Sequence, residues 1–179
     1  RNSTRSGDSS SASWKSVSAG YAHSCGIRTD DTLWCWGNNT YGEIGDGSNV
    51  SQRAVPTQVG TGTWRSVSAE GRHTCGVAGN GTLWCWGYNL YGQLGDGTYD
   101  YRLSPARVPN LERVRAIAAG EHHSVAMTDD GAVWVWGFNG SGQATGNDAM
   151  TRPWPVRVPE VADAVAVAAG SKSSFALTR

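Results

Sequence analysis

Four cysteines are the most reactive side chains of this sequence, and their spacing is regular. Cys25 and Cys35 are ten residues apart, and Cys75 and Cys85 repeat that separation fifty residues later. Each pair is centred on a polar turn, so its two members would face each other across a β-hairpin. They could form a cross-strand disulfide, which indicates an oxidising compartment, or remain two buried thiols. We favour the disulfide, and the long spacing disfavours a zinc site.

Three histidines, His23, His73 and His123, recur at the same fifty-residue interval. Three imidazoles on one rim of the molecule could hold a metal ion or take part in catalysis. Alternatively, the nitrogens of each ring satisfy backbone groups near an inner strand, and we favour this structural interpretation. His122 has no counterpart in the other copies, and exposure to solvent is the default for such a residue.

Two Asp-Gly pairs, Asp46-Gly47 and Asp96-Gly97, lie in glycine-rich segments where carboxylates could supply oxygen ligands to calcium. The alternating acidic positions of a calcium loop are missing, so turn formation explains these pairs better. The sequence also lacks a nucleophile elbow, a phosphate loop and a His-Glu-x-x-His motif. We therefore predict no catalytic residue, no metal site and no cofactor.

These residues belong to a repeat that organises the whole chain. A period of this length means that one supersecondary unit cannot bury its own apolar faces and must pack against its neighbours. In the third copy Val125 and Val135 replace both cysteines together, as expected if the two side chains touch. The copies begin with Trp14-Lys-Ser-Val-Ser-Ala, Trp64-Arg-Ser-Val-Ser-Ala, Val114-Arg-Ala-Ile-Ala-Ala and Ala164-Val-Ala-Val-Ala-Ala.

Each copy predicts three strands and suggests a fourth. The small residues of Ser16 to Ala19 suit a strand crowded near a central axis. A hairpin follows, running from His23 to Ile27 and returning from Thr32 to Trp36, and a last, Pro-bearing strand is expected near Pro56 to Val59. The returning strand is apolar on both faces, which is typical of stacked propeller blades and not of a two-sheet sandwich.

The combined pattern resembles a known family. It reads Ala-Gly-x-x-His-(Ser/Thr), then a hairpin turn, then Leu-Trp-x-Trp-Gly-x-Asn-x-x-Gly-(Glu/Gln)-(Ile/Leu)-Gly, and it is similar to the regulator of chromosome condensation repeat over residues 14–179. The resemblance implies a β-propeller, a ring that usually has seven blades in this family. It assigns structural roles to the repeated residues His23, His73, His123, Trp36, Trp86, Trp136, Gly37, Gly87 and Gly137.

We therefore predict an all-β chain forming a partial β-propeller of about three four-stranded blades plus the first strands of a fourth repeat. Three repeats cannot close a seven-bladed ring, so the arc is a fragment, stays open, or pairs with a second copy as a homodimer. The predicted division is a flexible Ser-rich leader over 1–13 and repeats over 14–63, 64–113, 114–163 and, in part, 164–179.

Charge and hydropathy narrow the choice of partner. Fifteen basic and fifteen acidic residues cancel, and neither sign gathers in a block, which disfavours nucleic acid. No apolar stretch approaches the 18 or more residues needed to cross a bilayer, which disfavours a membrane. The disulfide interpretation favours an extracellular or secreted protein, whereas reduced cysteines would favour the cytoplasm.

We predict a non-catalytic protein-interaction module that presents variable loops on rigid blades. The resemblance leaves three alternatives, namely a guanine-nucleotide exchange factor-like regulator of a small GTPase, a secreted inhibitor and a glycan-binding module. The candidate binding residues break the repeat while lying within it, and for each of them plain loop exposure or packing between blades is the alternative. They are Tyr21, Arg72, Tyr88, Leu90, Tyr99, Tyr101, Glu121, His122, Phe138 and Trp154.

Overall fold

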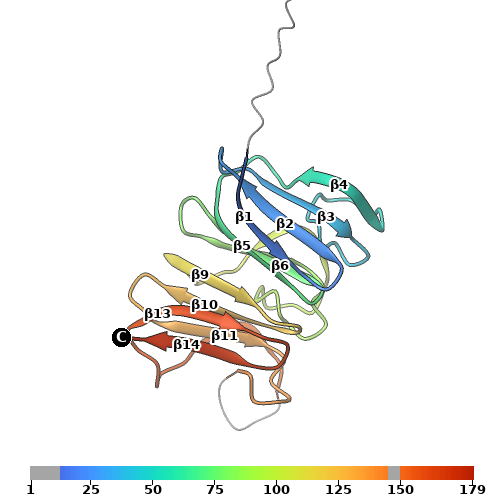
Figure 1. Ribbon diagram of the computed structural model, residues 1–179. Helices are drawn as coiled ribbons and strands as arrows, with labels where there is room; N and C mark the ends of the chain where they lie inside the picture. The colour runs from blue at the N-terminus through green and yellow to red at the C-terminus, as the bar shows by residue number, and fades with distance from the viewer. Residues whose placement is uncertain (1–12, 145–149) are drawn as a thin grey trace, which may run out of the picture.

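The computed structural model describes residues 13–144 and 150–179, whose regular secondary structure consists of strands (Figure 1). Nearly all of the predicted leader, residues 1–13, lies outside these ranges. The strands are β1 (Trp14–Ala19), β2 (His23–Arg28), β3 (Leu33–Asn38), β4 (Gln52–Gln58), β5 (Trp64–Glu70), β6 (His73–Ala78), β7 (Leu83–Gly87), β8 (Arg102–Arg107), β9 (Val114–Ala119), β10 (His123–Thr128), β11 (Val133–Gly137), β12 (Arg152–Arg157), β13 (Ala164–Ala169) and β14 (Ser174–Thr178).

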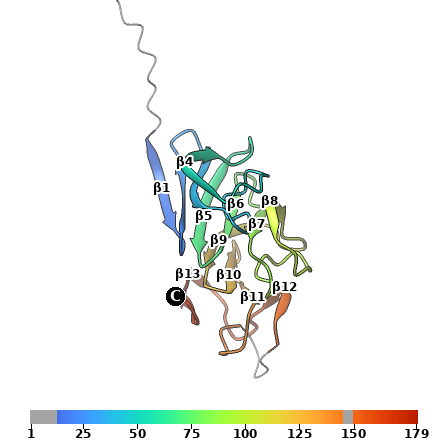
Figure 2. The same cartoon turned by 90° about the vertical axis from the view of Figure 1, so that its right-hand side faces the viewer.

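These strands form three four-stranded antiparallel sheets and one two-stranded sheet. The sheet orders are β1-β2-β3-β4, β5-β6-β7-β8, β9-β10-β11-β12 and β13-β14. The first strands of successive sheets contact one another and line one edge of the molecule, while β8 and β12 lie towards the opposite edge (Figure 2). The predicted all-β, partial propeller is confirmed, with β13 and β14 as the first strands of a fourth repeat.

The hairpin registers agree with the spacing argument. Cys25 lies directly opposite Cys35, Cys75 opposite Cys85, and Val125 opposite Val135. The sulfur atoms of the two cysteine pairs are 2.13 and 2.12 Å apart, at disulfide distance. The valine pair therefore occupies the place that a disulfide takes in the other two blades.

The first and the fourth strand of the repeat have bounds that differ from the predicted ones. The first strand begins at Trp14, two residues before the predicted start, because its pairing with β2 continues past a register shift. The fourth strand runs from Gln52 to Gln58 and ends before Val59, whose N–H donates to the carbonyl oxygen of Leu33 beyond the regular ladder. Pro56 lies in this outer strand, where a residue without an N–H is tolerated.

A buried tryptophan from each following blade fills the space between blades. Trp86 packs into the cluster of blade 1, and Trp136 packs into that of blade 2; both are completely buried. Their Nε1 groups donate to the carbonyl oxygens of Glu43 (2.9 Å) and Gln93 (2.8 Å). These bonds fasten the indole of one blade to the long loop of the blade before it.

The space between the third blade and the β13–β14 hairpin is filled differently. Among the described residues, no tryptophan belongs to its core cluster, which is built from Val125, Met127, Val133, Val135 and Ala164. A cleft of about 390 Å³ opens there. Phe175 and Leu177 on β14 are 62% and 63% exposed, so the apolar surface of this hairpin is only partly covered.

Candidate functional site

The short turns and the long loops of the repeats meet at one end of the sheets. Because the strands alternate in direction, the turn after the first strand and the loop after the third strand lie at the same end. The N–H of Asn38, Tyr88 or Phe138 donates to a carbonyl oxygen of the turn in its own blade. We call this end the loop rim, formed by residues 20–22, 39–51, 71–72, 88–101, 120–122, 138–144 and 170–173.

The repeated glycines allow this close approach. Gly37, Gly87 and Gly137 have positive φ angles of 108, 100 and 96°. A Cβ atom at any of these positions would lie 2.6 to 2.8 Å from a carbonyl oxygen of the neighbouring turn. Only glycine can occupy this conformation at such a distance without displacing the turn.

The Asp-Gly segments of the rim are turns that use their own carboxylates. Oδ1 of Asp46 accepts hydrogen bonds from Ser48, and Oδ2 pairs with the guanidinium group of Arg53. Burial alone would raise the pKa of Asp46, but the bonds from Ser48 and Arg53 lower it. Asp96 is bound in the same way by Thr98 and Arg102. In the third copy the corresponding segment lies outside the described residues.

Two of the three repeated histidines, His23 and His73, join neighbouring blades. Nε2 of His23 lies 2.8 Å from the hydroxyl oxygen of Thr74, which donates in turn to the carbonyl oxygen of Glu43 (2.9 Å). His73 and Ser124 repeat this arrangement one blade later, with an Nε2–Oγ distance of 2.9 Å. The partner is thus a hydroxyl group of the next blade and not a backbone group. Burial lowers the pKa of His23 to about 4 and that of His73 to about 3, so both rings are neutral at pH 7.

Residues 13–144 and 150–179 contain neither a metal-binding cluster nor a membrane-spanning helix. No group of three or more His, Cys, Asp or Glu side chains there could hold a metal ion. No helix in the same ranges is long and apolar enough to cross a membrane.

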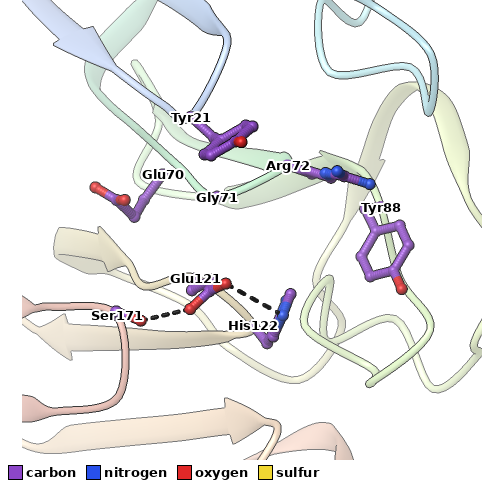
Figure 3. A pocket seen from close by; sticks show the side chains of 8 residues that line it. All are labelled: Tyr21, Glu70, Gly71, Arg72, Tyr88, Glu121, His122 and Ser171. Carbon is purple, nitrogen blue, oxygen red and sulfur yellow. Dashed lines mark hydrogen bonds and ion pairs between the residues drawn. The ribbon is translucent and has the colours of Figure 1, made fainter.

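A pocket of about 570 Å³ opens on the loop rim, where the turns of three blades meet the turn between β13 and β14 (Figure 3). Five residues predicted from the sequence lie together here, although they come from three different repeats. The lining residues are Tyr21, Glu70, Gly71, Arg72, Tyr88, Glu121, His122 and Ser171. The structure therefore gathers half of the predicted binding residues in one place.

Sequence reasoning missed Glu70, Gly71 and Ser171 as lining residues. Gly71 and Ser171 occupy the same repeat position as Tyr21 and Glu121, so the fifty-residue alignment could have found them. Gly71 has a φ of +51°, and a Cβ atom there would lie 2.3 Å from the carbonyl oxygen of Glu121. The absence of a side chain at this position lets the second and third turns touch.

The two sides of the pocket differ in charge. Glu121 accepts a hydrogen bond from the Ser171 hydroxyl group, which lowers the pKa of the carboxyl group, and its Oε1 lies 3.6 Å from Nε2 of His122. Burial lowers the pKa of His122, although the nearby Glu121 charge opposes this effect. Arg72 lies on the side of Tyr88, while Glu70 lies across Gly71 from it (Figure 3).

Arg72 is held between aromatic rings. Its guanidinium carbon lies 5.9 Å from the centroid of the Tyr21 ring and 5.3 Å from that of Tyr41. Nη1 of Arg72 also donates to the Tyr41 hydroxyl group at 3.1 Å. These cation–π contacts orient a side chain that is otherwise exposed to solvent.

An aromatic tract extends from the pocket along the rim. Neighbouring rings have centroids between 4.8 and 6.4 Å apart, within the range of favourable ring contacts. Tyr41 and Tyr91 were not predicted, because they share one repeat position and so look like ordinary members of the repeat. The tract consists of Tyr41, Tyr88, Tyr91, Tyr101, His122 and Phe138.

Three predicted binding residues lie outside both the pocket and the tract. The hydroxyl group of Tyr99 lies 3.4 Å from that of Thr151. Trp154 lies on β12 beside Gly97 and borders a separate cleft with Trp134 and two prolines. Leu90 is 52% exposed. The pocket and the aromatic tract therefore do not include them.

Comparison with family models decides the family. One model, described as the regulator of chromosome condensation (RCC1) repeat, matches residues 30–77, 80–127 and 130–177. A second model of the same repeat matches residues 14–43, 64–93 and 114–143. The chain belongs to the RCC1 repeat family. A comparison with curated proteins finds no sequence match for this RCC1-repeat chain.

Solved structures show the same fold. Prp20p from Saccharomyces cerevisiae, described with its binding properties to Gsp1p and histones, superposes with a TM-score of 0.82 at 23% identity, over 91% of this chain and 43% of its own. Human WBSCR16 has a TM-score of 0.83 at 25% identity, over 97% of this chain and 46% of its own. The ectodomain of the Physcomitrella patens receptor kinase CR4 has a TM-score of 0.56 at 25% identity, over 89% of this chain and 34% of its own. The RCC1-repeat chain thus spans less than half of each.

Proposed function

We propose that this chain is a non-catalytic protein-interaction module that binds its partner at the pocket and the aromatic tract of the loop rim. The observation that carries the proposal is the convergence of Tyr21, Arg72, Tyr88, Glu121 and His122 on one pocket beside an aromatic tract. Tyrosine and arginine side chains on a rigid support are typical anchors of protein interfaces. The ring of Tyr21 is 78% exposed and belongs to no buried cluster, so it is available to a partner.

Two comparisons support a protein as the partner class. Yeast Prp20p is described with Gsp1p and histones, and a second yeast structure contains Kap60 bound to Prp20. A second copy of this chain is a candidate partner as well, because the β13–β14 hairpin leaves apolar surface uncovered. Light scattering under non-reducing and reducing conditions would detect such a homodimer. The two cysteine pairs at disulfide distance support an oxidising, extracellular location.

The test is a selection of binders from a displayed library of random peptides against the immobilised chain. Affinities of the selected peptides are then measured for the wild type and for Tyr21→Ala, with Tyr99→Ala as the matched control outside the pocket. We expect Tyr21→Ala to weaken binding about tenfold or more, because exposed aromatic anchors carry much of an interface's energy. Tyr99→Ala should leave binding unchanged.

Two results would speak against the proposal. Peptides that bind Tyr21→Ala and the wild type equally well would place the interface elsewhere. If no peptide binds but a glycan array yields ligands whose retention depends on Tyr21, the rim is a glycan-binding surface instead.

A further inference from the structure

Arg72 is a cation on the loop rim, and no carboxylate of the described residues is paired with it. It borders the 570 Å³ pocket and also a neighbouring one of about 230 Å³, lined in addition by Asn38 and Glu43. No carboxylate in residues 13–144 or 150–179 forms an ion pair with its guanidinium group. By contrast, Arg53 on β4 and Arg102 on β8 are each paired with an aspartate of the loop that precedes the strand.

We propose that Arg72 is the docking point for an aspartate or glutamate side chain of the protein partner, bound between Tyr21 and Tyr88. This proposal rests on the proposed function, since it names the chemistry that the rim recognises. A guanidinium group presents a planar fork of donors that matches a carboxylate in bidentate geometry. Among the described residues, the one hydrogen-bond partner of the guanidinium group is the hydroxyl group of Tyr41, at Nη1, which leaves most of the fork available.

The side chain is ordered before a partner arrives. Two tyrosine rings lie within 6 Å of the guanidinium carbon, and one of them also accepts its hydrogen bond. Ordering a long arginine normally costs conformational entropy on binding, and a side chain that is already held loses less. The exposed Arg115 on β9 makes no cation–π contact with a ring of the described residues.

Two of the three carboxylates that line the pockets beside Arg72 are engaged with other groups. Glu43 interacts with the Arg72 charge, but it is almost fully buried, and its Oε2 accepts the N–H of Tyr41 at 2.8 Å. Glu121 is bound by Ser171 and faces His122. The Arg72 side of the pocket therefore carries a positive charge with no ion-pair partner among the described residues, and it complements an acidic residue.

The repeat itself does not require an arginine at this place. The corresponding residues of the other copies are Ala22, His122 and Lys172. A residue that only supported the blade would be replaceable by alanine, as it is in the first copy. The positive charge at position 72 is therefore not needed for folding, and its role lies at the protein surface.

The experiment determines which acidic residues the selected peptides share. It then combines substitutions in the peptide and at Arg72 in a double-mutant cycle. Selected peptides that depend on Tyr21 should share an Asp or Glu at one position. Replacing that residue by Asn or Gln should weaken binding to the wild type about 10- to 100-fold, the range for a charge-assisted hydrogen-bonded pair. With the Arg72→Gln variant, the same peptide replacement should weaken binding less than about twofold, because the guanidinium group that would bind the carboxylate is already absent.

Two more variants sharpen the test. Arg72→Lys keeps the charge but loses the fork, so it should recover only part of the affinity. Arg115→Gln is the matched control and should bind like the wild type. Because Arg72 is exposed, the thermal midpoint of Arg72→Gln should equal that of the wild type.

Three outcomes would overturn the inference. Tyr21-dependent peptides enriched in Lys or Arg would show that the Glu70 and Glu121 side selects the partner. Equal losses from the amide replacement with wild type and Arg72→Gln would show that the carboxylate binds elsewhere. Either result leaves the rim as a protein-binding surface, whereas the absence of any Tyr21-dependent peptide would refute the proposed function together with this inference.

Discussion

Single hydroxyl groups connect neighbouring blades of this protein. Oγ1 of Thr74 accepts from Nε2 of His23 and donates to the carbonyl oxygen of Glu43, and all three groups are buried. Thr74→Val keeps the shape but leaves the buried Nε2–H of His23 without its acceptor, at a cost of about 1–3 kcal/mol, and removes one of the two hydrogen bonds to the Glu43 carbonyl oxygen. We expect the free energy of unfolding, measured by urea denaturation, to fall by about 2 kcal/mol or more. Thr57→Val, at an exposed hydroxyl group on β4, is the control; similar losses in both variants would refute the link.

The buried histidines make stability depend on pH. In the unfolded chain they take up a proton near pH 6.5, whereas the folded chain keeps His23 neutral to about pH 4 and His73 to about pH 3. Between these values the unfolded state binds more protons, so the free energy of unfolding falls as pH decreases below 6.5. The expected slope approaches about 1.4 kcal/mol per pH unit for each histidine. Glu43, whose pKa is raised by burial, acts in the opposite direction. Denaturation curves at pH 7 to 4.5 would check this, and a flat profile would contradict it.

The contact between a long loop and the next blade depends on glycine. Gly45 has a φ of +78°, and a Cβ atom there would lie 2.6 Å from Nε1 of Trp86. Gly45→Ala therefore combines backbone strain with a clash against a buried indole, and we expect it to lower the free energy of unfolding by about 3 kcal/mol. Gly60→Ala is the matched control, since Gly60 also has a positive φ (+61°) but nothing within 4 Å. Gly60→Ala should lower the free energy of unfolding only by the backbone strain, about 1–2 kcal/mol. Equal losses would mean that the indole moves aside freely.

The strands were predictable because their signals are local. The interval between Cys25 and Cys35 fixes the hairpin and its register, and the apolar faces of the returning strand indicate cover on both sides. The pocket was only partly predictable, because it depends on how far each blade is rotated from the last. Gly71 has no side chain to attract notice, yet its contact with Glu121 closes the gap between two turns. Tyr41 and Tyr91 were overlooked because repetition suggests a structural role, whereas their rings lie in the tract on the rim.

Viewed as a whole, the molecule is a row of blades in which each unit gains stability from its neighbours. The second blade has a complete four-stranded sheet on both sides, and the tryptophans at its two boundaries are fully buried. The β13–β14 hairpin contacts a complete sheet on one side, through β9 and β10. In arrays of this kind stability is close to a sum of unit and interface terms. Local stability should therefore decrease from the second blade towards the β13–β14 hairpin.

Hydrogen exchange measured by mass spectrometry tests this gradient. The matched comparison is β10 with β14, which are second strands of their repeats and carry no disulfide. Every residue of β10 is buried, whereas four of the five residues of β14 are exposed. We expect amides of β14 to exchange at least about tenfold faster, because opening the hairpin uncovers little apolar surface and one edge of β14 has no strand partner among the described residues. Protection of β14 equal to that of β10 would show that a further surface, such as a second copy of the chain, covers the hairpin in solution; dilution would then restore fast exchange.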